Sequence, residues 1–180
     1  SGQFADMTQA VVPRFDLIRF ADYMRVGVQF SRGCPYNCEF CDIIELFGRR
    51  PRTKTPEQIL AELQALHDLG YRGHVDFVDD NFIGNKKQLK AEVLPALIEW
   101  RKGKVGMPFN TEASINLADD PELLQMMARA GFVKVFVGIE SPDDLSLEEC
   151  NKKHNRERDL IDSVQRDART CSFGLVSAAG

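Results

Sequence analysis

The sequence predicts an α/β protein built on a parallel sheet of four or five strands, either doubly wound or curved as part of a barrel. Two observations lead to this prediction. Short β-like runs alternate with amphipathic helical segments along the 180 residues. One run, VKVFVGIES (133–141), is almost continuously apolar, as expected for a strand buried on both faces. Apart from this alternation the chain has no internal repeat.

Five segments are predicted to be strands because they are short, rich in β-branched and aromatic residues, and bounded by turn residues. They are RVGVQF (25–30), GHVDFVDDNF (73–82), MPFNTEASI (107–115), VKVFVGIES (133–141) and the beginning of FGLVSAA (173–179). In the second segment, Val75, Phe77 and Asp79 share one face of the strand.

A helix is predicted over TPEQILAELQALHDLG (55–70). Thr55 suits the N-cap, Pro56 suits the first turn, and Gln58 stands at the third position of a capping box. Gly70 is expected to end the helix.

Three more helices are predicted downstream. The segment 85–100 contains Pro95, which predicts a kink or a restart of the helix. The segment 120–131 opens on Asp120 as N-cap, and 156–174 carries apolar residues at helical spacing.

The composition excludes several classes of protein. With 23 Lys and Arg against 27 Asp and Glu, the net charge is -4, so no nucleic-acid partner is expected. No apolar run approaches the roughly 18 residues of a membrane span, so no transmembrane segment is expected. The first ten residues, SGQFADMTQA, do not resemble a signal peptide. We therefore expect a cytoplasmic protein with one hydrophobic core.

The five cysteines are an odd number, and three of them are close together in SRGCPYNCEFCDII (31–44). Clustered thiols in a reducing compartment favour a metal site over a disulfide framework. Cys150 and Cys171 are expected to be small, partly buried hydrophobic residues.

The spacing C-x3-C-x2-C of Cys34, Cys38 and Cys41 favours an iron–sulfur cluster. A cubane cluster normally takes four cysteine ligands, so three leave one iron open to a substrate or cofactor. The alternatives are a structural zinc site and uncoordinated thiols. A zinc ion would need a fourth ligand, and the candidates are His67, His74, Cys150, His154 and Cys171.

With Phe40 directly before the last cysteine, this motif resembles the signature of the radical S-adenosylmethionine (radical SAM) superfamily. The flanking segments QFSRGCPYNCEFCDIIELFGRRPRTKT, GHVDFVDDNFIGNKK, TEASINLADDPELLQMMARAGF and VFVGIESP are similar to those of members with an N-terminal cobalamin-binding domain, above all the hopanoid methylase group. The resemblance spans residues 11 to 175. It implies a partial (β/α) TIM-like radical SAM barrel with about five parallel strands of the usual six.

The resemblance implies that Cys34, Cys38 and Cys41 hold a [4Fe-4S] cluster whose open iron binds S-adenosyl-L-methionine. Reductive cleavage of that cofactor would give methionine and a 5′-deoxyadenosyl radical. The parent enzyme would be a cobalamin-dependent C-methyltransferase whose cobalamin is bound by a domain absent from this chain. Its partners would be a small-molecule substrate, with a lipid-like one as an option, and a reductant such as a flavodoxin or ferredoxin.

Other functions remain open. The chain would otherwise be a zinc-stabilised binding module, or a non-catalytic fragment that retains only cluster binding.

The resemblance also implies cofactor-binding residues at the ends of the strands. Phe40 is expected near the adenine, and the other positions are expected near the methionine moiety or the ribose: Asp79, Asp80, Asn81, Glu112, Glu140 and Ser141. Because adjacent strand residues point in opposite directions, at most one of the two aspartates is expected to face the ligand. The alternatives are that the aspartates cap the next helix, that Glu140 pairs with a basic residue, and that Phe40 packs within the loop.

Two basic segments accompany the motif. GRRPRTK (48–54) is expected to be a solvated loop, or else to contact an anionic cofactor or a neighbouring domain through Arg50, Arg52 or Lys54. NKKHN (151–155) is expected at the surface.

We expect residues 1–22 to be a linker from an N-terminal region and residues 23–180 to be the radical SAM core. The chain stops where a parallel strand begins, and an unpaired strand is unfavourable at a sheet edge, so a C-terminally incomplete core is expected.

Overall fold

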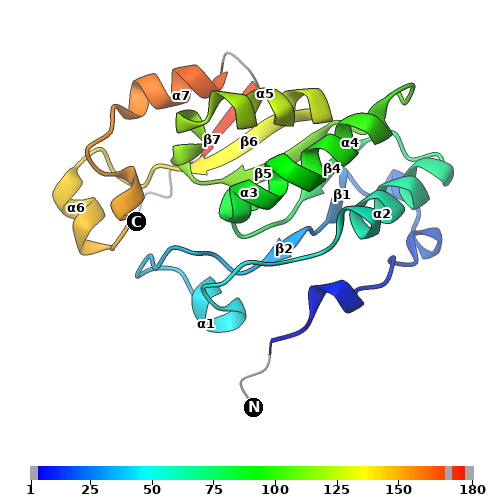
Figure 1. Cartoon of the computed structure of the whole chain (residues 1–180), viewed down its shortest axis with the longest axis horizontal. Coiled ribbons are helices and arrows are strands. Elements are labelled where there is room, and N and C mark those ends of the chain that lie inside the picture. The colour runs from blue at the N-terminus through cyan, green and yellow to red at the C-terminus, as the bar shows by residue number, and fades with distance from the viewer. Residues whose placement is uncertain (1–3, 169–171, 177–180) are drawn as a thin grey trace.

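The computed structural model of the chain describes residues 4–168 and 172–176, and its centre is a five-stranded parallel sheet (Figure 1). The strands are β1 (Arg25–Val28), β4 (His74–Phe77), β5 (Phe109–Ala113), β6 (Phe132–Gly138) and β7 (Ser172–Val176). Their spatial order follows their order in the chain. A doubly wound sheet would reverse its order at a switch point, so this topology is that of a partial (β/α) barrel.

The helices α2, α4 and α5 lie on the same side of the sheet, in front of it in Figure 1. The helices are α1 (Ile43–Phe47), α2 (Pro56–Asp68), α3 (Lys86–Gln88), a π-helical turn (Leu89–Val93), α4 (Leu94–Arg101), α5 (Pro121–Ala130), α6 (Asp144–Glu149) and α7 (Leu160–Ala168). Short 3-10 turns cover Met7–Gln9, Phe15–Leu17, Phe20–Asp22, Phe82–Asn85, Ile115–Asp119 and Lys153–Asn155. No helix in the described residues is both long enough and apolar enough to span a membrane.

The two faces of the sheet differ in chemistry. Under the helices, Phe77, Phe82, Phe109 and Phe132 pack edge to face or tilted, with ring centroids 4.8–5.4 Å apart. The other face carries polar side chains, and there Asn110 Nδ2 donates to Asp76 Oδ1 at 2.6 Å. The helix-covered face therefore forms the hydrophobic core.

The predicted capping residues of the helices at 55–70 and 120–131 are confirmed. In α2, Thr55 Oγ1 accepts from the N–H of Gln58 at 3.3 Å, and Gln58 Oε1 accepts from the N–H of Thr55 at 2.9 Å. In α5, Asp120 is the N-cap and Gly131 ends the helix with φ +102°. These contacts satisfy backbone groups that a helix end otherwise leaves unpaired.

The predicted interruption near Pro95 is present, one turn earlier than the proline itself. The N–H of Leu94 donates to the carbonyl of Leu89, which forms the π-helical turn just before α4. Proline lacks an N–H and its ring crowds the preceding turn, so a wider turn at this point accommodates it.

The predicted helix over 156–174 is wrong at its start and at its end, where residues 172–174 belong to β7. Asp159 Oδ1 accepts from the N–H of Asp162 at 2.9 Å, so α7 begins only at Leu160. Residues 169–171 lie outside the described residues. Strand β7 confirms the strand predicted at 173–179 as far as residue 176, and the remainder of that segment also lies outside the described residues.

A small antiparallel pair was not predicted. Strand β2 (Ser31–Arg32) pairs with β3 (Arg52–Thr53) and so closes the loop 33–51, which contains the three clustered cysteines and α1. Two-residue strands carry no periodic pattern, so the sequence offered no signal for them. Helix α6 was missed for a similar reason, because it is only six residues long.

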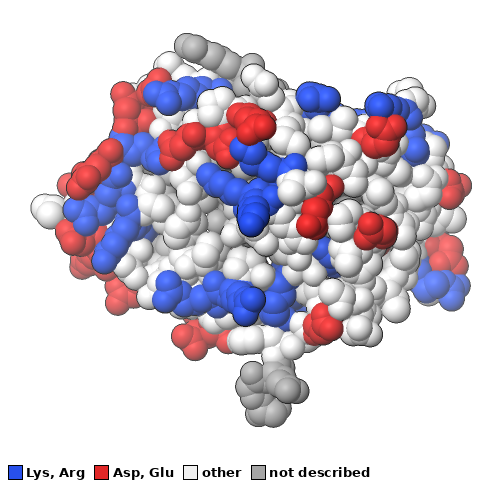
Figure 2. Space-filling view, in the orientation of Figure 1, with Lys and Arg blue, Asp and Glu red and all other residues white. Residues whose placement is uncertain are grey.

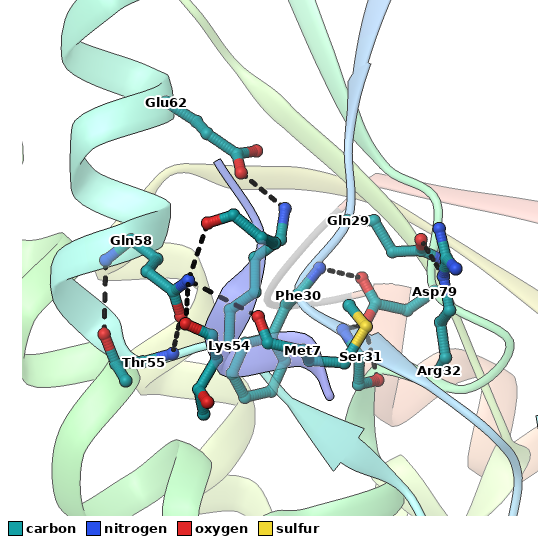
Figure 3. A network of polar contacts seen from close by, with 12 residues as sticks. Met7, Gln29, Phe30, Ser31, Arg32, Lys54, Thr55, Gln58, Glu62 and Asp79 are labelled. Atoms are coloured by element: carbon teal, nitrogen blue, oxygen red, sulfur yellow. Dashed lines mark hydrogen bonds and ion pairs between the residues drawn. The ribbon is translucent and has the colours of Figure 1, made fainter. Parts of the chain in front are cut away.

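None of the three basic residues Arg50, Arg52 and Lys54 lines the cavity described below. Arg52 donates to the carbonyl oxygens of Ala5 and Phe47. Lys54 forms an ion pair with Glu62 of α2 (Figure 3).

Burial makes the Lys54–Glu62 pair important for stability. The two side chains are only 8% and 2% exposed, and burial raises the pKa of Glu62. The N–H of Lys54 also donates to the carbonyl of Phe30 at 2.8 Å. The pair therefore holds the end of the cysteine-containing loop against α2.

Removing one partner of this pair should be more damaging than removing both. We expect Glu62→Leu to lower the free energy of unfolding by about 3–5 kcal/mol, because Lys54 is left charged and buried. The double variant Lys54→Met with Glu62→Leu should recover most of that loss. Urea unfolding of the wild type, both single variants and the double variant measures the coupling. Additive losses would contradict the role of the pair.

Candidate functional site

The three clustered cysteines line one cavity at the carboxyl edge of the sheet. The cavity has a volume of about 270 Å³. Its other lining residues come from the cysteine loop, from the ends of β4, β5 and β6, and from the segment after α6: Tyr36, Phe40, Asp80, Asn81, Glu112, Ala113, Ser114, Phe136, Val137, Gly138, Glu140, Lys152 and His154. In parallel α/β folds this edge is where ligands bind.

Two consecutive aspartates after β4 hold the start of the cysteine loop. Asp79 is 2% exposed, and its carboxylate accepts from the N–H of Phe30 at 3.2 Å and from the N–H and the hydroxyl of Ser31 (Figure 3). Asp80 Oδ2 accepts from the N–H of Gly33 at 2.7 Å. The loop thus leaves the sheet along a path set by two carboxylates.

Of the three residues predicted after β4, only Asp80 and Asn81 line the cavity. Asp79 lies beneath the loop, and its contacts are structural, so its predicted position at a cofactor is not the one in the structure. Burial raises the pKa of Asp79 to about 6, against the opposing effect of its hydrogen bonds. Neither aspartate caps α3, because its N-cap is Asn85.

Glycine is required at position 33, where the beginning of the cysteine loop passes close to the backbone of residues 47–50 near its end. Its φ is +99°, and an added Cβ would lie 2.9 Å from the carbonyl oxygen of Gly48 and 3.0 Å from that of Arg50. The N–H of Cys34 donates to the same Gly48 carbonyl at 3.3 Å. Both neighbours are backbone atoms, so a side chain at this position would displace the loop.

The ends of β4 and β5 also contribute an ordered amide, Asn81, and a carboxylate, Glu112. Asn81 accepts from the N–H of Ser114 at 3.2 Å and donates to its hydroxyl at 3.2 Å. The Glu112 carboxylate forms no hydrogen bond or ion pair within the described residues. Burial raises the pKa of Glu112, and the negative charges of Asp80 and Asp76 add to this effect.

Glu140 and Ser141, predicted at the end of β6, are in different positions. Glu140 lines the cavity and forms a buried ion pair with Lys152, which is the alternative considered for it from the sequence. Ser141 lies outside the lining, and its hydroxyl accepts from the N–H of Asp143 at 3.1 Å, at the start of α6. Phe40 lines the cavity, with Lys152 Nζ 5.5 Å from the ring centroid.

The prediction that residues 151–155 belong to the surface is wrong. The carbonyl of Cys150 accepts from the N–H of Glu39 at 2.9 Å, and Asn151 Nδ2 donates to the carbonyl of Asn37 at 2.6 Å. This segment therefore packs directly against the cysteine loop, over a sequence separation of more than 110 residues.

Eight lining residues were not among the predicted cofactor-binding residues, and of these only His154 was considered, as a zinc ligand: Tyr36, Ala113, Ser114, Phe136, Val137, Gly138, Lys152 and His154. The rings of Tyr36 and His154 stack with centroids 3.7 Å apart, and Asn116 Nδ2 donates to the Tyr36 hydroxyl at 2.8 Å. Burial lowers the pKa of His154 to about 4, and Lys152 and Arg158 add to the effect, so the imidazole is neutral at pH 7. No local pattern marked these residues, because long-range packing brings them to the cavity.

Cys34, Cys38, Cys41 and Cys150 are free thiols in this structure. Burial raises the pKa of Cys34 and of Cys38, and the charges of neighbouring thiolates add to this effect. Such thiols ionise when a bound metal centre supplies positive charge. No group of three His, Cys, Asp or Glu in the described residues could hold a single metal ion. Three thiols that line one shared cavity have the chemistry of iron–sulfur cluster ligands.

The sequence profile of the Radical SAM superfamily matches residues 28–166. An uncharacterised methyltransferase from Synechocystis sp. is 51% identical over 162 residues, which make up 89% of this chain and 30% of that protein. The hopanoid C-2 methylase from Rhodopseudomonas palustris is 44% identical over 177 residues, or 97% of this chain and 33% of that protein. The chain thus spans about a third of the length of these curated relatives.

Solved structures support the same fold. The cobalamin-dependent S-adenosylmethionine radical enzyme OxsB, solved with aqua-cobalamin and S-adenosylmethionine, superposes with a TM-score of 0.76 at 19% identity, over 96% of this chain and 26% of its own. The radical S-adenosylmethionine methyltransferase TsrM from Kitasatospora setae gives a TM-score of 0.70 at 16% identity, over 84% of this chain and 28% of its own.

Two glycine variants distinguish the effect of a steric clash inside the cysteine loop from the effect of a positive φ alone. Gly33→Ala should lower the free energy of unfolding by more than about 3 kcal/mol and prevent iron incorporation, because its Cβ meets two carbonyl oxygens. Gly70→Ala is the matched control, since Gly70 also has a positive φ, +84°, but open space around it. It should cost only about 1–2 kcal/mol. Chemical unfolding and iron analysis measure both, and equal effects would contradict the role of this clash.

Proposed function

The chain belongs to the radical SAM superfamily, and we propose that it is the core domain of a radical SAM enzyme. In this proposal Cys34, Cys38 and Cys41 ligate a [4Fe-4S] cluster, and S-adenosyl-L-methionine binds beside it in the cavity. The main support is that the three thiols line one cavity together with polar side chains from the ends of three neighbouring strands. Residues 23–180 would form this core, with residues 1–22 leading into it.

The thiols suit this cluster by chemistry and by number. Iron–sulfur clusters take thiolate ligands, and three cysteines leave one iron open. When bound, the cluster supplies the electron that cleaves S-adenosyl-L-methionine into methionine and a 5′-deoxyadenosyl radical. The chain's own residues must then hold the cofactor beside the open iron and keep water out.

The cavity offers groups for each part of the cofactor. Asp80 and Asn81 stand next to the cysteine loop, where their oxygens can accept from the amino group of the methionine moiety. Glu140 lies across the cavity, where its carboxylate can accept from a ribose hydroxyl, and Phe40 offers an apolar ring to the adenine. Glu112 adds an exposed carboxylate that pairs with no side chain in the described part of the chain, so it is free to contact a ligand. For Ser141 and Asp79 we propose indirect roles, in which they position α6 and the loop.

We further propose that the parent enzyme is a cobalamin-dependent C-methyltransferase acting on a small molecule. The support is that two similar proteins are named as a methyltransferase and a hopanoid C-2 methylase, and that the fold neighbours are titled as cobalamin-dependent or cobalamin-bound. Cobalamin would be bound by another part of the parent enzyme, since this chain covers only 26% and 28% of the two fold neighbours whose titles name cobalamin. A lipid-like substrate agrees with the name of the second relative.

Anaerobic reconstitution with iron and sulfide tests the proposal. The wild type should bind about four irons and four sulfides and, once reduced with dithionite, should convert S-adenosyl-L-methionine into 5′-deoxyadenosine and methionine. The Ala variants of Cys34, Cys38 and Cys41 should each lose the cluster and this activity. Cys150→Ala is the matched control, because Cys150 does not line the cavity and its thiol donates to the Leu147 carbonyl, at 3.6 Å. It should retain both.

Three outcomes would contradict the proposal in different ways. One zinc per chain without iron or sulfide would identify a zinc-stabilised binding module. A cluster without any 5′-deoxyadenosine would identify a fragment that retains only cluster binding. A cluster that survives Cys38→Ala would show that the ligands are assigned wrongly.

A further inference from the structure

A buried ion pair lies at the end of β6, on the wall of the cavity. Lys152 and Glu140 form it, and their side chains are only 10% and 13% exposed. An added Cβ on Gly138 would lie 2.5 Å from Glu140 Oε1 and 2.7 Å from Lys152 Nζ. The ion pair therefore occupies the space that a larger residue at position 138 would need.

Buried hydrogen bonds hold the backbone at the end of β6, where Glu140 has an unfavourable conformation. Its φ is +66°, which is uncommon for a residue other than glycine. The buried Asn155 side chain donates to the carbonyls of Gly138 and Ile139, at 2.9 Å each. Strained residues that the surrounding structure holds in place are concentrated at functional sites, so the position of the Glu140 carboxylate needs a functional explanation.

The segment 150–154 contacts the cysteine loop at every residue between the cysteines except Pro35. The pairs are Tyr36 with His154, Asn37 with Asn151, Glu39 with Cys150 and Phe40 with Lys152. Because the residues on both sides of Lys152 are fixed to the loop, its ammonium group has a defined place beside the Phe40 ring and the Glu140 carboxylate.

Lys152 is the only Lys or Arg among the described residues that line the cavity. The lining also contains the carboxyl groups of Asp80, Glu112 and Glu140, and the three thiols that would bind a cluster as thiolates. Burial raises the pKa of the Cys38 thiol, and the positive charge of Lys152 opposes this effect. The charge of Lys152 thus acts on the cysteine loop.

The charge around an iron–sulfur cluster helps to set its reduction potential. An added electron makes a thiolate-ligated cluster more negative, so nearby carboxylates disfavour reduction and a nearby cation favours it. Both effects are strong where water is excluded, because the local dielectric constant is low. In the proposed function the cluster must be reduced before it cleaves S-adenosyl-L-methionine, so one buried cation in an acidic cavity affects a required step.

We propose that Lys152 raises the reduction potential of the cluster, and that Glu140 limits this effect by pairing with it. This inference rests on the proposed function. Lys152 acts on the cluster through its charge and ligates no iron. A one-electron reductant supplies the electron that the cluster gains, and no bond forms or breaks in this step.

The test is a redox titration of the reconstituted protein with dithionite, without S-adenosyl-L-methionine, in which electron paramagnetic resonance follows the reduced cluster. For Lys152→Met we expect the equilibrium constant for reduction to fall at least tenfold, which corresponds to about 59 mV for one electron. Glu140→Gln should raise this constant, because the charge of Lys152 is then no longer balanced. Lys152→Arg keeps the positive charge and should give a potential close to that of the wild type.

The matched controls remove the same charges from a largely exposed ion pair, Lys102 with Glu99. This pair lies at the end of α4, before β5 begins, and hence at the sheet edge opposite to the cavity. Figure 2 shows that Lys and Arg side chains are interspersed with Asp and Glu on the surface, where water and salt screen their charges. Lys102→Met and Glu99→Gln should therefore leave the potential unchanged.

The proposal is overturned if Lys152→Met and Lys102→Met shift the potential equally, or if Glu140→Gln lowers it. An unchanged potential in Lys152→Met, with iron and sulfide bound as in the wild type, also overturns it and leaves the proposed function intact. If Lys152→Met binds no cluster, Glu140→Gln decides, and a wild-type potential in that variant overturns the proposal. A wild type that binds no cluster overturns the proposed function, and the role of Lys152 with it.

Discussion

The site depends on two carboxylates that accept hydrogen bonds from backbone N–H groups where the chain leaves the sheet and enters the cysteine loop. Asp79 accepts from Phe30 and Ser31, and Asp80 accepts from Gly33, directly before Cys34. Hydrogen bonds to carboxylates are stronger than those between neutral groups, and these are largely shielded from water. The position of the first cysteine is therefore set by β4, a neighbouring strand in the sheet, as well as by the chain that leads to it.

The rest of the cavity is built around this fixed point. The buried Lys54–Glu62 pair holds the far end of the loop, and the segment after α6 packs against its middle through Asn151 and His154. A loop held at both ends and at its centre can present three thiols to one space with little freedom to rearrange. Pre-organisation of this kind lowers the entropic cost of assembling a cluster, because the ligands need not be ordered when it binds.

Local sequence signals predicted much of this structure, and long-range contacts account for what was missed. The spacing of the cysteines, the capping box at Thr55 and the strand periodicity are readable within a few residues. Strand alternation predicted that one aspartate at most would face the ligand, but only the tertiary fold shows that Asp80 lines the cavity and Asp79 does not. Lys152 and His154 follow a short helix with no strong pattern, and their place depends on packing against a loop that is distant in sequence.

The central claim is that three thiolates leave one iron of a [4Fe-4S] cluster open to S-adenosyl-L-methionine. Mössbauer spectroscopy of the protein reconstituted with ⁵⁷Fe tests it most directly, because it resolves individual iron sites. Addition of S-adenosyl-L-methionine should shift one of the four irons to a higher isomer shift and leave the other three unchanged. A spectrum that the cofactor does not alter would contradict the account.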